Sequence, residues 1–206
     1  MELSALVAPA KTAVLTMELQ RGICGDSALF RQLRDAVTAA GVEQNTAQLL
    51  DTARAAVATV GHCVFTMTPS REGTRMDLPL MSAARKDPNY VLQGSEQAQV
   101  LPMLGPHPSD LISERHVSVT PFTGSDLHQQ LSERGIETVV ICGVSLNVGV
   151  PGMTIEAVNL GYNVVVARDC VAGFPEDYAQ GVLVNMLPSM STVSDSQSII
   201  SCWTSR

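Results

Sequence analysis

The sequence has no cluster of basic residues and no long apolar run. Its 206 residues carry a net charge of −7, and Lys and Arg are not gathered into a stripe. A nucleic-acid surface normally needs such a cluster to neutralise phosphates, so we expect no nucleic-acid partner.

No apolar stretch approaches the roughly 18 residues that span a bilayer. The first residues, MELSALVAPAK, also lack the layout of a signal peptide. We therefore expect no membrane contact and a cytoplasmic location.

Paired cysteines are also missing. The five cysteines are odd in number, widely spaced and contain no CxxC motif. This pattern predicts neither a disulfide framework nor a zinc site. Cys63 and Cys142 lie in apolar runs, where a buried and unreactive thiol is expected. The histidines form no spacing typical of metal ligands, so we expect no metal and no other cofactor.

The order of apolar segments predicts the fold. The length suits one domain with a sizeable core, so we expect a single domain over residues 1–206. Short β-branched runs alternate with segments of helical spacing. Strands are expected at 12–19, 62–68, 111–115, 138–141, 162–167 and 191–193, and helices at 44–60 (capped by Gly61), 126–133, 150–160 and 175–187. This alternation predicts an α/β fold, a doubly wound three-layer sandwich with a central, mostly parallel sheet of about six strands.

The segment 70–108 has no regular periodicity. Prolines interrupt it repeatedly, at positions 79, 88, 102, 106 and 108. Such spacing predicts loops and short helices. We expect this segment to fold over one end of the sheet as a partial lid.

Chemically useful residues follow three of the expected strands. Glu18 ends the first strand, Arg115 and His116 follow the third, and the turn from Ser145 to Gly149 leads from the fourth into a helix. The carboxyl ends of parallel strands meet at one edge, where helix N-terminal amides also point. A carboxylate and a base there can perform acid/base catalysis. The alternative is that Glu18 makes a structural hydrogen bond and that His116 is a surface residue.

Four segments match the pattern of a known family in order and spacing. They are 18–20 (ELQ), 122–127 (FTGSDL), Gly143-Val144 with the helix that ends in Gly161-Tyr162, and 168–173 (RDCVAG). Through them the chain resembles the isochorismatase-like hydrolases, also called the cysteine hydrolase superfamily. The resemblance implies an α/β sandwich and, in the hydrolytic members, a triad of Asp, Lys and Cys.

The sequence departs from this triad at all three places. Glu18 matches the Asp, and Gly149 matches the nucleophilic Cys. His116 matches the Lys, or Arg115 does if the alignment slips by one residue. Glycine offers no thiolate, which excludes acyl-enzyme chemistry at this position. The isochorismatases proper also resemble this chain in having Gly there. The resemblance therefore implies that Glu18 acts as an acid, provided that burial raises its pKa toward neutrality.

The resemblance implies further features of the site. Arg75 lies roughly where isochorismatases hold a substrate carboxylate, although a solvated loop position is the alternative. The peptide bond before the Cys position is often cis in the family, which makes Val144-Ser145 the candidate here. The Asp and His zinc ligands of the nicotinamidase branch have no counterpart in this sequence. The substrate-binding residues expected are Arg75, Arg115, Phe122, Ser145 and Gly149.

Two functions are compatible with these features. The first is an isochorismatase-like hydrolase that acts on a small, anionic metabolite by acid/base chemistry, with Glu18 and His116 as the pair. The second is a catalytically silent member that binds a small ligand or serves as an assembly subunit, which the replaced triad favours. The resemblance also implies a homodimer or a larger homo-oligomer.

Overall fold

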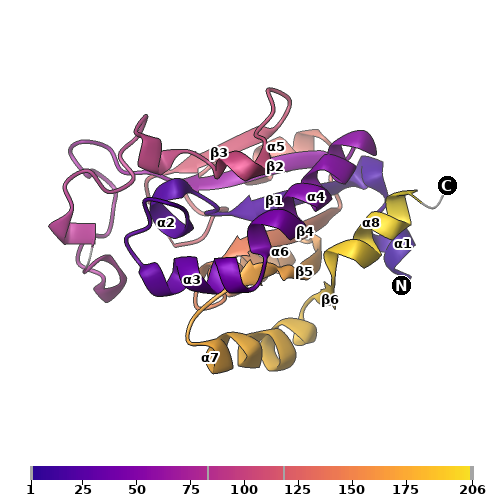
Figure 1. The fold of residues 1–206 in the computed structure, drawn as a ribbon. Coiled ribbons are helices and arrows are strands. Elements are labelled where there is room, and N and C mark those ends of the chain that lie inside the picture. The colour runs from indigo at the N-terminus through magenta and orange to yellow at the C-terminus, as the bar shows by residue number, and fades with distance from the viewer. Residues whose placement is uncertain (1, 83, 118, 205–206) are drawn as a thin grey trace.

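One parallel sheet organises the chain. The computed structural model describes residues 2–82, 84–117 and 119–204. Six strands pair in the order β3-β2-β1-β4-β5-β6, and every neighbouring pair is parallel (Figure 1). The strands are β1 (Thr12–Met17), β2 (Thr59–Phe65), β3 (Leu111–Arg115), β4 (Thr138–Val144), β5 (Asn163–Ala172) and β6 (Thr192–Ser194). The predicted α/β fold is therefore confirmed.

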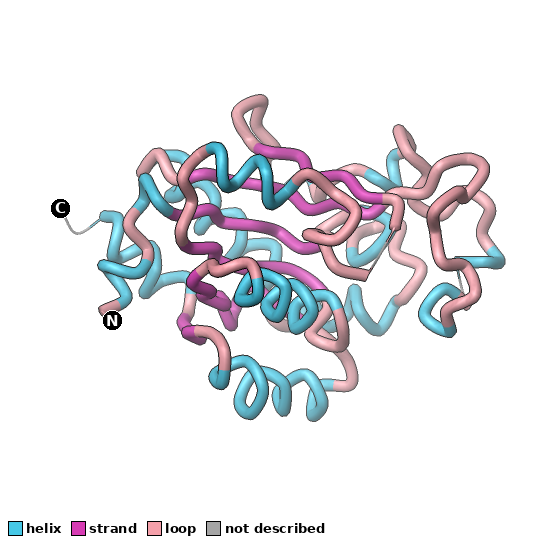
Figure 2. The backbone as a smooth tube through the Cα atoms, turned by 180° about the vertical axis from the view of Figure 1, so that it is seen from behind, coloured by secondary structure: helices cyan, strands magenta, loops and turns pink. Residues whose placement is uncertain are grey.

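Helices cover both faces of the sheet. Figure 1 looks onto the layer of α3 (Arg31–Ala39), α4 (Val42–Ala55) and α8 (Ser196–Thr204). Figure 2, seen from behind, looks onto α5 (Leu127–Glu133), α6 (Gly149–Asn159) and α7 (Glu176–Gly181), which a π-helical turn, Val182–Met186, prolongs. Two shorter helices are α1 (Leu3–Leu6) and α2 (Arg21–Cys24).

The central strands separate two hydrophobic cores. Both β1 and β4 are buried along their whole length, as is typical of strands covered on both faces. Side chains alternate between the faces, so Val14 and Val140 pack with α4 while Leu15 and Ile141 pack with α6. The apolar runs in the sequence thus supply both cores at once.

Several boundaries differ from the predictions, among them those of β2, which spans Thr59–Phe65 and not 62–68. The helix expected at 44–60 ends at Ala55, because Val57 adopts a left-handed φ of 60° and β2 begins at Thr59. Gly61 therefore lies within β2, and its prediction as a helix cap is wrong. Strand β5 continues to Ala172, well past the expected end at 167. Helix α8, which follows β6, was not predicted.

The segment 70–108 has the irregular structure that its prolines predict. Its ordered pieces are the short 3₁₀ helices Pro79–Met81, Ala84–Lys86, Glu96–Ala98 and Pro102–Leu104. The backbone N–H of Met67 donates to Val91 O and that of Gln93 donates to Met67 O, which ties the segment to the end of β2. The segment therefore lies beside the carboxyl end of the sheet.

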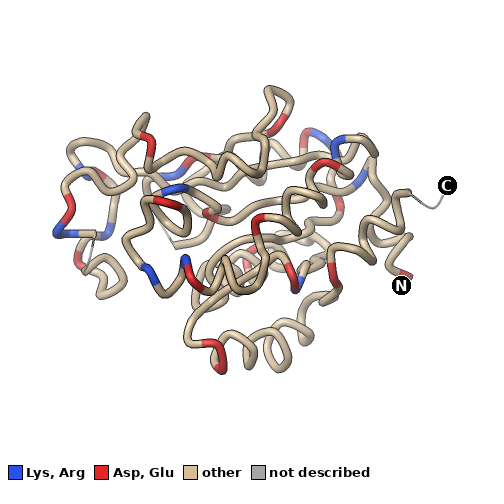
Figure 3. Tube along the Cα trace, in the orientation of Figure 1, with Lys and Arg blue, Asp and Glu red and all other residues tan. Residues whose placement is uncertain are grey.

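Charge is mixed over the described surface. Lys and Arg positions are interspersed with Asp and Glu (Figure 3). Among the described residues, no helix combines the length and the apolar character needed to cross a membrane.

Candidate functional site

Glu18 occupies a strained turn directly after β1. Its φ is 52°, a left-handed conformation that is uncommon outside glycine. The turn is fixed by its own backbone, because Glu18 N donates to Cys63 O at 2.9 Å and Gln20 N donates to Glu18 O at 2.8 Å. The side chain is 20% exposed. Its carboxylate is thus held at the carboxyl edge of the sheet.

The side-chain contacts of Gln20 explain why a glutamine stands two residues after Glu18. The side chain is fully buried and lies at the end of β2. Its amide nitrogen donates to Phe65 O at 2.9 Å and to Ala98 O at 2.8 Å, and its oxygen accepts from Phe65 N at 2.8 Å. One side chain therefore joins β1, β2 and the proline-rich segment.

Arg115 contacts Glu18 from two strands away. It ends β3, and its Nη2 donates to Glu18 Oε1 in an ion pair. The guanidinium crosses the end of β2 and lies 5.6 Å from the centre of the Phe65 ring, within the range of a cation–π contact. The Arg115 side chain is only 1% exposed. Its Nε and Nη1 are buried and have no hydrogen-bond partner among the described residues.

His116 points to a different partner. Its Nδ1 lies 3.0 Å from Thr66 Oγ1 and 3.1 Å from Thr66 O. Of the two residues proposed for the Lys position, the structure therefore brings Arg115, and not His116, to Glu18. The sequence contained a signal for this choice, because Leu111, Ser113 and Arg115 share one side of β3 and all are buried.

Two other candidates lie away from Glu18. Arg75 is 67% exposed and forms an ion pair with Asp77 at 2.7 Å. Phe122 is buried and stacks on Tyr162, with ring centres 5.9 Å apart. Its N–H donates to Glu156 on α6 at 3.2 Å, so the FTGSDL segment anchors a loop to α6.

The turn between β4 and α6 approaches β1 closely. Gly143 has a φ of 110°, and a Cβ atom there would lie 2.2 Å from Met17 O, so only glycine fits. The Val144-Ser145 peptide bond is cis, as predicted. Ser145 O accepts from Val148 N and Val150 N at 3.2 and 3.0 Å, which starts α6 at Gly149.

These elements enclose a pocket of about 280 Å³. Glu18, Ser145 and Gly149 line it, whereas Arg75, Phe122 and His116 do not. The proline-rich segment contributes part of the wall, which agrees with its prediction as a partial lid. The lining residues are Glu18, Ile23, Phe30, Leu33, Phe65, Leu80, Met81, Ala84, Tyr90, Val119, Ser145, Asn147, Val148, Gly149 and Phe174.

Tyr90 and Asn147 are polar lining residues that sequence reasoning missed. Burial, and then the nearby charge of Glu18, raise the pKa of Tyr90, so its phenol stays a hydrogen-bond donor at neutral pH. Asn147 accepts from Phe174 N at 3.1 Å and donates to Phe174 O, which holds the loop after β5. Asn147 lies in the predicted turn from Ser145 to Gly149 but was not singled out there, and Tyr90 reaches the pocket only through the path of an irregular segment.

A thiol near the pocket is inert. Cys24 is buried, and burial raises its pKa to about 12. Its Sγ donates to Glu18 O at 3.7 Å. A thiol in this state is protonated at neutral pH and is a poor nucleophile. Among the described residues, no group of three His, Cys, Asp or Glu side chains is placed to hold a metal ion.

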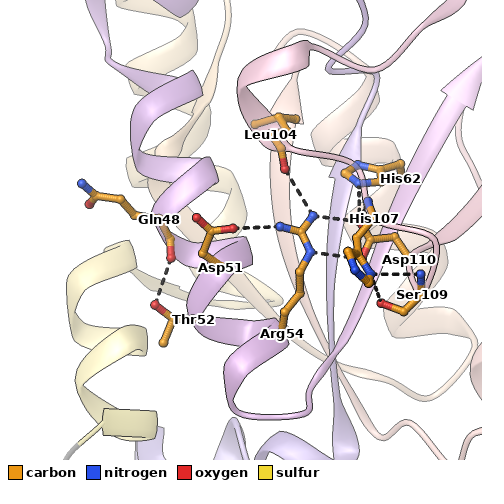
Figure 4. Close-up of polar contacts among 9 residues, drawn as sticks. All are labelled: Gln48, Asp51, Thr52, Arg54, His62, Leu104, His107, Ser109 and Asp110. Carbon is orange, nitrogen blue, oxygen red and sulfur yellow. Dashed lines mark hydrogen bonds and ion pairs between the residues drawn. The ribbon is translucent and has the colours of Figure 1, made fainter.

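A second cluster of charges lies between α4, β2 and the start of β3. Arg54 points from α4 toward Asp110 and donates to both of its oxygens, at 3.1 and 2.7 Å (Figure 4). His62 is fully buried between Asp110, 3.3 Å from its Nε2, and Thr16, 2.8 Å from its Nδ1. Burial lowers the pKa of His62, and Asp110 offsets this only in part. None of these side chains is among the described lining residues of the pocket, and their hydrogen bonds join α4, β2 and the start of β3.

Sequence comparisons match most of the chain to one family model. The Isochorismatase domain model matches residues 12–198. A stretch of 79 residues is 34% identical to an uncharacterized isochorismatase family protein of Escherichia coli O157:H7, YecD, and covers 38% of this chain and 42% of that protein. Another of 95 residues is 32% identical to YwoC of Bacillus subtilis (strain 168) and covers 46% and 49%. These alignments span less than half of each relative.

Solved structures show the same architecture. A cysteine hydrolase from Pseudomonas syringae pv. phaseolicola 1448A superposes with a TM-score of 0.83 at 20% identity, over 97% of this chain and 95% of that one. An isochorismatase family protein from Burkholderia thailandensis gives 0.76 at 26% identity, over 94% and 96%. The likeness thus extends over nearly the whole of each chain.

Proposed function

Because this chain belongs to the isochorismatase family, we propose that it is a hydrolase that acts on a small molecule bound in the pocket beside Glu18. Glu18 transfers the proton, Arg115 holds Glu18 in place, and no covalent intermediate forms at Gly149. The observation that carries this proposal is the position of the Glu18 carboxylate, which lines the pocket and is paired with a buried guanidinium.

The chemistry follows from the groups around Glu18. An ionised carboxylate only accepts hydrogen bonds, so Glu18 in this form takes a proton from water or from the substrate and returns it to the leaving group. The N-terminus of α6 lies beside it, where the helix dipole favours negative charge that develops on the substrate. A fixed cation next to Glu18 keeps the carboxylate in one position, which supports proton transfer.

The replacement Glu18→Gln tests this function. The wild-type protein is incubated with a panel of vinyl ethers, esters and amides, and mass spectrometry identifies a compound that it consumes. With that compound, Glu18→Gln should lower kcat by about 100-fold or more, because the general acid/base group is lost. Gln retains an oxygen that accepts from Arg115, so circular dichroism should show a folded protein.

The remote variant Arg168→Gln is the matched control. Arg168 is 59% exposed and paired with Asp195 on the surface, so kcat should not change. Full activity of Glu18→Gln would contradict the role of Glu18.

A second candidate function is ligand binding without catalysis. Gly149 supplies no nucleophile, and Arg115 already engages Glu18, which favours this alternative. It predicts binding in the pocket with no compound consumed. Assembly as a homodimer or larger homo-oligomer, and a cytoplasmic location, stay predictions. Size-exclusion chromatography with light scattering checks the first.

A further inference from the structure

The lining of the pocket carries little charge. Of the described lining residues, Glu18 alone carries a carboxyl group, none is Lys, Arg or His, and most of the others are aliphatic or aromatic. An anionic ligand would therefore bring a second negative charge next to Glu18 in apolar surroundings. Such a charge is costly to bury unless a cation pairs with it.

Arg115 is not available as that cation. Its Nη2 is bound to Glu18. The two nitrogens that remain, Nε and Nη1, are buried and so are closed to a ligand in the pocket. The Glu18–Arg115 pair is thus neutral as a whole, and it presents its carboxylate side to the pocket.

The arginines of the proline-rich segment are also engaged elsewhere. Arg71 donates to Asp87 O at 2.8 Å, and Arg85 donates to Met76 O at 2.6 Å. Arg75 forms its ion pair with Asp77. None of the three is among the described lining residues. The lid therefore contributes apolar surface and not positive charge.

Tyr90 supplies a hydrogen-bond donor in this apolar wall. The residue is 5% exposed and lines the pocket. Glu18 lines the same pocket and supplies an acceptor. A ligand group with both a carbonyl and an N–H or O–H complements this pair.

We propose that the pocket selects an uncharged, mainly apolar small molecule that carries one polar group, such as a primary amide, between Tyr90 and Glu18. This inference rests on the proposed function for the location of the substrate, and it replaces the anionic metabolite expected from the sequence. It makes Tyr90 a specificity-determining residue.

Calorimetry with matched neutral and anionic probes tests the proposal. The pairs are benzamide and benzoate, cinnamamide and cinnamate, and hexanamide and hexanoate, each titrated near neutral pH. At least one amide should bind about tenfold or more tightly than its acid, because the acid must bury an unpaired charge beside Glu18. The proposal is wrong if no amide binds, or if the acids bind as tightly as their amides.

Two variants locate the effect in the pocket. Glu18→Gln should reduce or reverse the preference for amides, since the repelling carboxylate is gone and Arg115 is no longer neutralised. Tyr90→Phe should weaken amide binding by about threefold to tenfold, as expected for one lost hydrogen bond. It should leave binding of styrene, which has no polar group, unchanged. An unaltered amide affinity in Tyr90→Phe would contradict the role of Tyr90.

Binding and turnover are measured in separate experiments. One result can therefore contradict the proposed ligand class without contradicting the proposed hydrolysis, and the reverse also holds. A preference for amides without consumption of any compound supports the ligand class and contradicts hydrolysis. Consumption of an anionic ester or vinyl ether in preference to a neutral one, lost in Glu18→Gln, supports hydrolysis and overturns the ligand class.

Discussion

The structure leaves little room for a side chain at position 149. An added Cβ would lie 2.9 Å from Val144 O and 2.8 Å from Met17 Cε. The Met17 side chain is flexible and can move. The Val144 carbonyl cannot move as easily, because it belongs to β4 and β4 is paired with β5. A side chain at position 149 therefore requires its surroundings to shift.

We predict that Gly149→Cys creates no thiol hydrolase and destabilises the fold. The Cβ must displace Val144 or Met17, which should lower the free energy of unfolding by about 1–3 kcal/mol, as overpacking usually does. Urea denaturation measures this change, and assays on simple amides and esters measure the activity.

Gly181→Ala provides the matched control for this prediction. Gly181 has an ordinary helical φ of −59°, and its Cβ would meet only Asn185 Nδ2, at 4.0 Å. Alanine there should preserve stability or raise it by up to about 1 kcal/mol. Equal stability of the two variants would show that position 149 has room for a side chain.

The partner of Glu18 shows what residue-level reasoning could and could not reach. The motif placed both Arg115 and His116 at the correct edge of the sheet. The choice between them depends on which side of β3 each faces, and the buried alternation through Leu111 and Ser113 favours Arg115. Arg75 could not be placed from sequence, because its exposed ion pair with Asp77 is set by the path of an irregular loop.

At the scale of elements, α4 is joined to β2 and β3 by the cluster of Arg54, His62 and Asp110. Asp110 has a 1% exposed side chain. Burial alone would raise its pKa, but hydrogen bonds from Arg54 and from His107 N outweigh burial and lower it. Asp110 is therefore ionised throughout the neutral range, while His62 beside it is kept neutral by burial. As the pH falls, His62 should therefore be protonated before Asp110.

We predict that stability falls as the pH drops below about 6.5, the ordinary pKa of histidine. The folded protein holds His62 at a lowered pKa, so the unfolded chain binds more protons in this range. His62 should contribute a loss of up to about 1.4 kcal/mol per pH unit. The stability that Asp110 supplies is lost only at lower pH, as the pH falls through its own lowered pKa.

Urea denaturation between pH 7.5 and 5.5 measures the contribution of His62. The replacement His62→Gln removes the titrating group and retains polar atoms for Thr16 and Asp110. Its stability should vary less with pH than that of the wild type. Parallel pH profiles of the two proteins would rule His62 out as the source.

The elements themselves were predictable where apolar periodicity was long. The buried strands β1 and β4 stood out as continuous apolar runs. Helix α8 was missed because only Ile199 and Trp203 of its apolar residues are buried, too few for a clear period. The early end of α4 could not be read from periodicity, since Val57 continues the apolar spacing yet is 83% exposed.

At the scale of the whole molecule, long-range contacts determine the site. The Gln20 side chain bonds to Phe65 O and Ala98 O, which are 45 and 78 residues away. No local pattern encodes such pairs, which explains why the alternation of strands and helices was predictable while the lid contacts and Tyr90 were not. The same kind of contact joins the two ends of the chain, because Trp203 Nε1 donates to Val7 O at 2.6 Å.

Trp203 also allows a test of the prediction that residues 1–206 form a single domain. Trp203 is the sole tryptophan of the chain and packs in the core on the α4 side of the sheet, so its fluorescence reports on that side. Leu131 of α5 is fully buried in the core on the opposite side.

If residues 1–206 unfold as one unit, Leu131→Ala should lower the free energy of unfolding by about 2–5 kcal/mol for both sides together. The urea midpoints from Trp203 fluorescence and from far-UV circular dichroism should then shift equally. A fluorescence midpoint that stays at the wild-type value while the dichroism midpoint falls would mean that the two layers unfold independently.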